Sequence, residues 1–271
     1  MTPPQPIHMY WFNRKPNFGD ELSPVLCAAL SGRPVRHTQD FTECELVAIG
    51  SILHLVTDPD YGGMIWGSGF IRPPEAPSTF PHARITAVRG HLTRKLLGCP
   101  DDMPLGDPGL LAARFAPACP KRFTVGIVPH YIDMGDPIVN KVADKSDAIT
   151  LIDPRSGVQN VIDRVAQCEC IVASCLHALV TADSLGIPNA WIKIGDRIIG
   201  GDFKFRDYYS VFGIDDPRPI RFGRWDNARS LARKLRGYRR DGVEQIKQRL
   251  IDAFPFRKQS TDHATPGSVP A

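Results

Sequence analysis

The residue best placed for chemistry in this chain is His177, the last residue of the motif Ser174-Cys-Leu-His177. The apolar run over residues 170–173 predicts a strand directly before the motif, and residues 177–185 predict an apolar helix after it. A histidine in the first turn of a helix can donate a proton near neutral pH, or bind an anion while it is charged. The alternative is a histidine whose ring is satisfied by a backbone group at the start of the helix.

A second candidate site is the motif Asn17-Phe-Gly-Asp20, which lies between a predicted strand and a predicted helix. Glycine lets the backbone turn tightly there, and the amino end of the following helix presents unpaired N–H groups with a positive field. We expect Asn17, Gly19 and Asp20 to hold an anion or an acceptor hydroxyl. The alternative is an ordinary Asx turn, in which Asp20 caps the helix.

Small residues also follow two further predicted strands. They form the turns Gly50-Ser51 and Gly67-Ser68-Gly69, and each turn allows a ligand to approach the backbone closely. Each turn alone is a weak signal. Together with Asn17-Phe-Gly-Asp20, however, they place three such turns at the carboxyl ends of strands, where they would line one rim.

Basic residues follow other strands in the same way. Arg89 comes directly after a predicted strand, and His130 and Arg155 occupy similar positions in the second half. A guanidinium grips a carboxylate or phosphate in a forked geometry, so Arg89 is a candidate for binding an anionic ligand. Lys204 lies in a basic and aromatic loop over residues 200–209, which would cover a charged donor, stack on a sugar or pack its own aromatics. Each of these side chains has the alternative of a solvated turn residue.

The elements that must position these residues follow one pattern, in which an apolar strand ends in a small or polar turn and leads to a helix or loop. This pattern is typical of an α/β fold with open parallel sheets, in which ligands collect at the carboxyl ends of strands. Strands are expected at residues 8–12, 44–50, 64–66, 85–88, 123–128, 148–152, 170–173 and 190–194. Helices are expected at residues 21–30, 91–97, 158–166 and 177–185. Prolines and small residues near 115–120 mark a boundary, so we expect domains at 1–116 and 117–255 and a disordered tail at 256–271.

Composition narrows the class of protein. The net charge of +4 is mild, and no lysine-rich block interleaves with aromatics, so nucleic acid is not the expected partner. The seven cysteines form no metal-ligand spacing and are expected to be free thiols, and we expect no metal. The N-terminus lacks a signal-peptide pattern, and no apolar run is long enough to span a membrane. These features predict a cytoplasmic protein.

Taken in order, the motifs resemble those of the polysaccharide pyruvyltransferase family, over about residues 10–212. The resemblance rests on Asn17-Phe-Gly-Asp20, Gly50-Ser51, Trp66-Gly-Ser-Gly69, Val88-Arg-Gly90, Gly106-Asp-Pro108, Val128-Pro-His130, Ser174-Cys-Leu-His-Ala178 and Ala182-Asp-Ser-Leu-Gly-Ile-Pro188. Phe203-Lys-Phe-Arg-Asp-Tyr-Tyr209 resembles a segment of the exopolysaccharide ketal-pyruvate transferase branch. The resemblance implies two Rossmann-like domains facing across a cleft, similar to the glycosyltransferase B-type fold, with the acceptor on the N-terminal side and the donor on the C-terminal side.

The resemblance also implies a reaction and roles for residues. Phosphoenolpyruvate is the expected donor, with no further cofactor, and a saccharide, expected to be lipid-linked, is the acceptor. His177 matches the family's proposed general acid. Arg89, Lys193, Ser174 and Leu176 fall near its donor-binding positions. Many members carry arginine where this chain has Cys175, so one expected cation is absent, and Arg155 and Lys204 are the candidates to replace it.

Two other functions remain open at this point. A nucleotide-sugar-dependent glycosyltransferase would share the architecture, and a non-catalytic carbohydrate-binding protein would be consistent with Cys175 in place of arginine.

The C-terminal part of the chain suggests a further partner. Residues 226–254 are expected to be helical with breaks near Gly237 and Gly242, and several arginines recur there at three- and four-residue spacings: Arg229, Arg233, Arg236, Arg239 and Arg240. Such a helix face predicts peripheral contact with the anionic inner face of the plasma membrane. The alternative is a solvated face paired with acidic residues.

Overall fold

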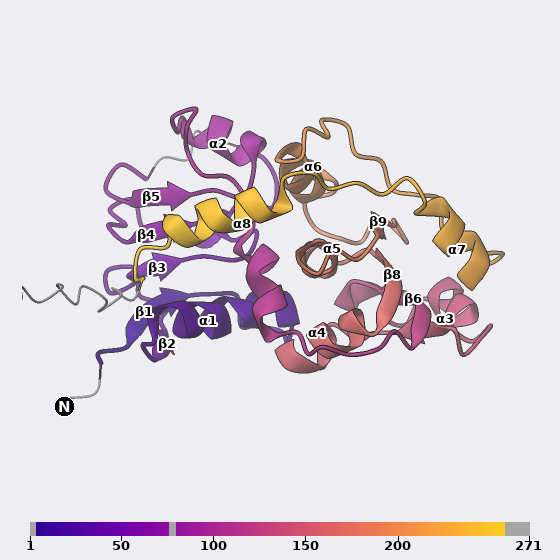
Figure 1. Ribbon diagram of the computed structural model, residues 1–271. Coiled ribbons are helices and arrows are strands. Elements are labelled where there is room, and N and C mark those ends of the chain that lie inside the picture. Colours follow the sequence, from indigo (N-terminus) through magenta and orange to yellow (C-terminus); the bar gives the residue numbers. More distant parts are fainter. Residues whose placement is uncertain (1–3, 76–79, 258–271) are drawn as a thin grey trace, which may run out of the picture.

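The computed structural model describes residues 4–75 and 80–257, and within them two fully parallel sheets carry the fold (Figure 1). The first sheet has the order β2-β1-β3-β4-β5. Its strands are β1 (Ile7–Tyr10), β2 (Val35–His37), β3 (Leu46–Val47), β4 (Met64–Trp66) and β5 (Arg84–Ala87). After β1 the chain adds β2 on one side and β3 on the other. The strand order therefore reverses between β1 and β3.

The second sheet repeats this plan with the order β7-β6-β8-β9. Its strands are β6 (Phe123–Val128), β7 (Ile149–Leu151), β8 (Cys168–Ala173) and β9 (Asn189–Trp191). The central strands β6 and β8 are rich in β-branched residues and buried along most of their length, as expected for parallel strands covered on both faces. The order of this sheet reverses between β6 and β8.

Between the two sheets lies one continuous hydrophobic core, which includes residues of both halves. The segments in this layer are α1 (Phe18–Ser31), η2 (Pro108–Phe115), α4 (Val158–Ala166) and α5 (Leu176–Ser184). Helix α5 is buried along its whole length, including its polar residues His177, Thr181, Asp183 and Ser184. Two smaller cores cover the outer faces of the sheets. The shared central core fixes the two sheets against each other.

Several elements of the second half return to the first. Helix α6 (Phe203–Ser210) packs against α2 (His91–Leu97), and α8 (Val243–Asp252) lies across the first sheet (Figure 1). Trp66 Nε1 donates a 2.9 Å hydrogen bond to the Leu250 carbonyl of α8. The remaining short elements are η1 (Leu53–Leu55), η3 (Tyr131–Asp133), α3 (Pro137–Ala143) and α7 (Ala228–Lys234). The C-terminal helices are therefore shared between the halves, and the domain boundary stays a prediction.

The predicted α/β class with two parallel sheets is confirmed, but four local predictions need correction. Helix α1 begins at Phe18 with Asn17 as its N-cap, so Asp20 is not the cap. The expected loop over 200–209 contains α6 from Phe203 onward. Helix α7 ends at Lys234, so Arg236, Arg239 and Arg240 lie beyond it. Phe256 packs against Phe254, and the rest of the predicted tail, 258–271, lies outside the described residues.

Candidate active site

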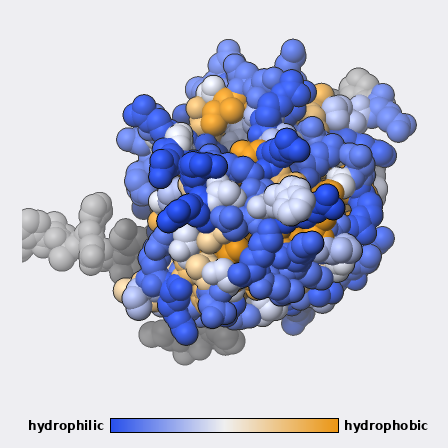
Figure 2. Space-filling view, turned by 90° about the vertical axis from the view of Figure 1, so that its right-hand side faces the viewer, coloured by the Kyte–Doolittle hydropathy of each residue, from blue (hydrophilic) through white to orange (hydrophobic). Residues whose placement is uncertain are grey.

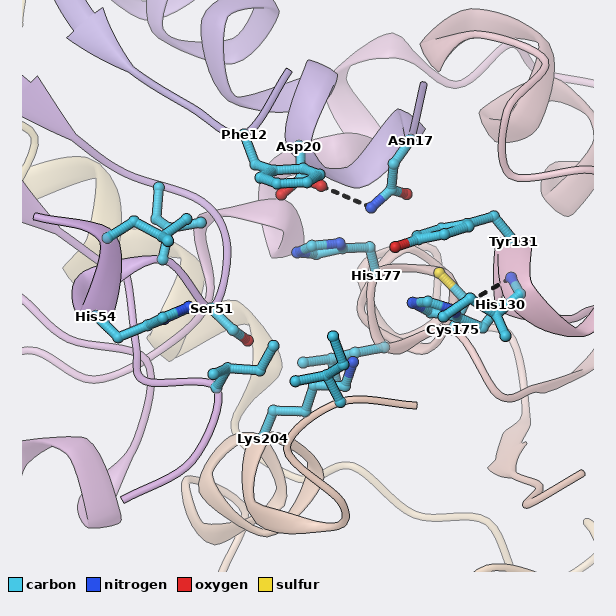
Figure 3. A pocket seen from close by; sticks show the side chains of 16 residues that line it. Phe12, Asn17, Asp20, Ser51, His54, His130, Tyr131, Cys175, His177 and Lys204 are labelled. Atoms are coloured by element: carbon cyan, nitrogen blue, oxygen red, sulfur yellow. Dashed lines mark hydrogen bonds between the residues drawn. The ribbon is translucent and has the colours of Figure 1, made fainter. Parts of the chain in front are cut away.

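A cavity of about 210 Å³ lies where the carboxyl ends of the two sheets meet (Figure 3). Most of its wall is built from segments that follow β1, β3, β6 and β8, and the segments after β4 and β9 add Ile71, Ile199 and Lys204. Strands β1, β3, β6 and β8 flank the two reversals of strand order, which is where open α/β sheets bind ligands. The residues that line it are Phe12, Asn17, Asp20, Ser51, Ile52, His54, Leu55, Ile71, His130, Tyr131, Ile132, Cys175, Leu176, His177, Ile199 and Lys204. The sequence motifs of both halves thus converge on one pocket.

His177 is the second residue of α5 and is 9% exposed. Its ring lies against Gly19, where a Cβ atom would come within 1.9 Å of Nδ1, so any residue but glycine at position 19 would displace the imidazole. Its Nε2 atom is buried and has no hydrogen-bond partner among the described residues. Burial, aided by the charges of Lys204 and Arg89, lowers the pKa of His177 to about 3. The ring is therefore neutral in the ligand-free protein.

Lys204 enters the pocket from α6 and is only 8% exposed. Within the described part of the chain, its amino group forms no ion pair and no hydrogen bond. Burial lowers its pKa, while Cys175 and Asp20 act in the opposite direction. A buried cation without a partner is costly, and an anionic ligand would supply the missing charge. Lys204 is thus the best candidate for an anion-binding residue.

Cys175 lies at the N-cap position of α5 and lines the same pocket. It stands at the position where the family resemblance implied an arginine. Burial raises the pKa of its thiol. Of the two cations expected to replace the arginine, the structure places Lys204 in this pocket. Arg155 lies outside it, 48% exposed, and its NH2 atom is 2.7 Å from Asp153 Oδ2.

Asp20 lies on the opposite wall, in the first turn of α1. The Asn17 side chain donates a 2.7 Å hydrogen bond to Asp20 Oδ2 and also accepts from the Gly19 N–H as the N-cap. Burial raises the pKa of Asp20 to about 7, although the Asn17 hydrogen bond and the charge of Lys204 both lower it. The carboxyl group therefore exchanges a proton near neutral pH.

His130 and Ser174 are both close to the pocket but play different parts. His130 lines it, and burial together with Lys204 lowers the pKa of its ring to about 3. Ser174 is fully buried behind the wall, where its hydroxyl donates to Asp133 Oδ2 (3.0 Å) and accepts from the His130 N–H (2.8 Å). Ser174 therefore supports His130 from behind and does not line the pocket.

Arg89 differs from the expectation that it projects into the cleft. It is fully buried and does not line the pocket. Its Nε pairs with Asp207 Oδ2 at 2.9 Å, NH1 donates to the Ser51 hydroxyl, and NH2 donates to the Phe70 carbonyl at 2.6 Å. All three guanidinium nitrogens are thus occupied, and the role of Arg89 is to connect α6 with the turn that carries Ser51.

Lys193 is also placed away from the pocket. The Lys193 side chain is 40% exposed, and its amino group lies 2.8 Å from Asp196 Oδ1 on the surface loop after β9.

Of the two glycine turns, only one reaches the pocket. Ser51 lines the pocket, while Gly67, Ser68 and Gly69 lie behind it. The Ser68 hydroxyl donates to the Gly50 carbonyl, and a Cβ at Gly69 would meet the Arg89 guanidinium at 2.6 Å.

Sequence reasoning missed part of the lining, chiefly its aromatic and apolar members. Phe12, His54, Tyr131 and Ile199 contribute to the wall without belonging to any of the singled-out motifs. Phe12 and Tyr131 follow β1 and β6 within three residues. For Tyr131, its position after an expected strand was the available signal, whereas Phe12 fell inside the strand expected at residues 8–12 and lies beyond the end of β1. His54 lies in η1, whose placement depends on packing of the second hydrophobic core.

The fold and the pocket define an α/β protein with two Rossmann-like halves and a cavity at the carboxyl ends of both sheets. A family model for polysaccharide pyruvyl transferases matches residues 17–196, which is more than half of the chain. The chain belongs to this family, and it is therefore a transferase of the pyruvyltransferase class.

Two relatives have similar sequence identities to this chain. "Uncharacterized protein L143" of Acanthamoeba polyphaga mimivirus is 27% identical, over 77% of this chain and 75% of that protein. "Succinoglycan biosynthesis protein ExoV" of Rhizobium meliloti (strain 1021) is 26% identical, over 76% of this chain and 64% of that protein. Across residues 4–75 and 80–257, no helix is long and apolar enough to cross a membrane.

Proposed function

We propose that this protein transfers the enolpyruvyl group of phosphoenolpyruvate to sugar hydroxyls of an exopolysaccharide precursor, forming a pyruvate ketal and releasing phosphate. The choice of phosphoenolpyruvate as donor rests on Lys204. This buried lysine lines the pocket together with His177 and Cys175, and its amino group forms no hydrogen bond or ion pair with the described residues. Phosphoenolpyruvate brings a carboxylate and a phosphate, which would satisfy such a cation. The name of ExoV, a succinoglycan biosynthesis protein, agrees with a polysaccharide acceptor.

In this proposal His177 is the general acid. It is neutral before the donor arrives, because burial and nearby positive charge lower its pKa. A donor with several negative charges acts in the opposite direction and favours the imidazolium. His177 then protonates the methylene carbon, a sugar oxygen bonds to the neighbouring carbon, and the bond to phosphate breaks as a second hydroxyl closes the ketal. The proton of the second hydroxyl leaves with the phosphate.

Pocket size favours phosphoenolpyruvate over the rival donor. The cavity of about 210 Å³ is smaller than the roughly 300–1,000 Å³ typical of sites for drug-sized ligands. A nucleotide sugar is of that larger class, whereas phosphoenolpyruvate has few heavy atoms. The glycosyltransferase reading would need the two halves to separate before the donor could enter.

The decisive experiment combines purified protein, phosphoenolpyruvate and extracts that contain lipid-linked repeat units. Phosphate release that depends on both substrates, with a pyruvyl mass added to the saccharide, is the expected result. Release of a nucleoside diphosphate from a nucleotide sugar would instead identify a glycosyltransferase. Binding of the oligosaccharide without consumption of any donor would identify a carbohydrate-binding protein.

We further propose that the enzyme works in the cytoplasm and touches the inner membrane face, where a lipid-linked acceptor would be presented. The basic surface differs from the one expected. Arg240 is turned inward, with its Nε 3.3 Å from the buried Asp183 Oδ2, and is therefore not one of the arginines of the proposed membrane-facing surface. Trp225 belongs to this surface instead: it is 79% exposed, and the Arg224 guanidinium lies 4.8 Å from its ring centroid. Figure 2 looks at the side where α7 lies, and hydrophilic residues cover most of it, so attachment there would be mainly electrostatic.

A further inference from the structure

The two walls of the pocket carry different titratable groups, a lysine on one and a carboxyl group on the other. Lys204, His177 and His130 come from the second half of the chain, whereas Asp20, the carboxylic acid of the lining, comes from α1 in the first half, which also contributes His54. An anionic donor is attracted to the first wall and repelled by an ionised carboxylate on the second. The wall that carries Asp20 is therefore left for the uncharged substrate, the sugar hydroxyl.

Asp20 is placed to act on a ligand. It is 7% exposed, and its only side-chain hydrogen bond among the described residues is the one that Asn17 donates to Oδ2. Figure 3 shows Asp20 and His177 directed into the same part of the pocket. They come from adjoining elements, because the His177 ring lies against Gly19, the residue before Asp20. A buried carboxyl with a free oxygen at a ligand cavity needs a role beyond holding the helix.

We infer that Asp20 is the base that takes the proton from the attacking sugar hydroxyl, opposite His177 as the acid. This assignment rests on the proposed pyruvyl transfer. The sugar O–H bond breaks as the new O–C bond forms, and its proton goes to Asp20. The double bond of the donor takes the proton of His177 at its methylene carbon. Asp20 then returns the proton to His177, and both groups regain their starting states.

The charge states of the two side chains fit this cycle. Without ligand, the pKa of Asp20 is raised to about 7 by burial and that of His177 is lowered to about 3, so near neutral pH a shared proton resides on Asp20. A donor bound beside Lys204 favours moving that proton to His177. Several other charged or titratable groups act on Asp20 or respond to its charge: Tyr10, Glu21, Asp107, Tyr131, Cys175 and Lys204.

The test uses Asp20→Asn, which keeps the shape but cannot take a proton, with Glu21→Gln as the matched control on the same helical turn outside the pocket lining. Calorimetry with phosphoenolpyruvate alone measures donor binding. Phosphate release with the lipid-linked extract, from pH 5.5 to 9, measures transfer. We expect Asp20→Asn to bind the donor at least as well as the wild type. Transfer should be slower by about 10²–10⁴-fold, the usual contribution of one proton-transfer group.

The pH profile separates a base from a merely structural residue. The wild-type rate should fall as the pH rises through the Asp20 ionisation near neutral pH, because the shared proton that His177 needs is then lost. This ionisation should be missing from the pH profile of Asp20→Asn, and formate should partly restore transfer in Asp20→Ala. Transfer within threefold of the wild type, or parallel loss of donor binding, would overturn the role of Asp20. A wild-type protein that neither binds nor consumes phosphoenolpyruvate would overturn the proposed function itself, and this assignment with it.

Discussion

Two buried polar clusters lie close together in this molecule, and they differ in how completely their groups are paired. Arg89 makes three hydrogen bonds, and its partner Asp207 also accepts from the Thr93 N–H and hydroxyl at 2.8 and 2.7 Å. In the pocket, the Lys204 amino group and the Nε2 atom of His177 form no hydrogen bond and no ion pair with the described residues, and Lys204 has only the Phe205 ring, 5.6 Å away. Buried polar groups without partners destabilise a fold, so the second cluster costs stability that only a ligand can return.

The comparison separates residues that hold the structure from residues that await a ligand. Both clusters contain a buried cation, and burial alone therefore does not distinguish them. What distinguishes them is the ion pair: Arg89 contacts the Asp207 carboxylate at 2.9 Å, whereas no ion pair of Lys204 occurs within the described residues and Asp20 acts on it only across the pocket. Substitutions in the paired cluster should lower stability, whereas substitutions in the unpaired cluster should lower activity and leave stability equal or higher.

The largest expected effect is on turnover. His177→Gln should lower phosphate release by about 10²–10⁴-fold or more, because glutamine cannot transfer a proton. The free energy of unfolding should hardly change, since Nε2 has no partner to lose. Kinetics and urea denaturation measure the two effects. His82→Gln, at an exposed histidine, is the control. Near wild-type turnover in folded His177→Gln would remove His177 as the acid.

The largest expected effect on stability is at Arg89. Arg89→Ala leaves Asp207 buried without its charge partner, and breaking such a pair costs about 3–5 kcal/mol. Urea denaturation measures the loss. Arg155→Ala is the matched control, because Arg155 also follows a strand but pairs with Asp153 on the surface. Equal stability of the two variants would show that the Arg89 cluster does not hold the fold.

Asp20 should make stability depend on pH. Its pKa in the folded protein, about 7, lies above its value in an unfolded chain. The folded state therefore binds the proton more tightly, and wild-type stability is lost as the pH rises from about 4 to 7. Asp20→Asn lacks this loss, so its advantage in the free energy of unfolding should grow over that range, to at most about 4 kcal/mol. Urea denaturation at pH 5 and pH 8 measures it, and parallel curves would contradict it.

Lys204 should affect donor affinity without supporting the fold. A charge-assisted hydrogen bond contributes roughly 1.5–3 kcal/mol, so Lys204→Met should weaken phosphoenolpyruvate binding by about one to two orders of magnitude. The free energy of unfolding should stay equal or increase, because an unpaired buried charge is removed. Calorimetry and denaturation give both numbers. Lys193→Met, at a surface lysine paired with Asp196, should change neither.

The sequence predicted the layout of the fold well, because long apolar runs ended by small residues specify parallel strands. Strands β4 and β6 and helices α2 and α4 have the expected bounds. The prediction also placed His177, Asp20 and His130 after strands, and the family resemblance implied that the two halves face each other across a cleft. Strand ends of parallel sheets meet at one edge, and that rule needs no knowledge of side-chain packing.

The direction of a side chain after a strand could not be predicted in the same way. Arg89 and Arg155 have equivalent sequence positions, but Asp207, 118 residues further along the chain, holds Arg89 inside the protein. Lys204 reaches the pocket because α6 is a helix packed on α2, and that packing depends on the same Asp207. The identity of the donor-facing cation thus depends on a tertiary contact that no local pattern reveals.

The smallest expected effect concerns the membrane. Trp225 and Arg224 lie exposed beside α7, and further arginines on the same stretch are exposed as well: Arg221, Arg229 and Arg233. Each basic residue near an anionic leaflet contributes about 1 kcal/mol, so attachment should be weak and sensitive to salt. Sedimentation with anionic vesicles at low salt should retain the wild type and release Arg224→Gln and Trp225→Ser in part. Arg218→Gln is the control, because Arg218 already lies 2.8 Å from Asp216 Oδ2. Equal recovery in the supernatant with anionic and neutral vesicles would mean that this surface is simply solvated, and that the acceptor reaches the pocket without help from the leaflet.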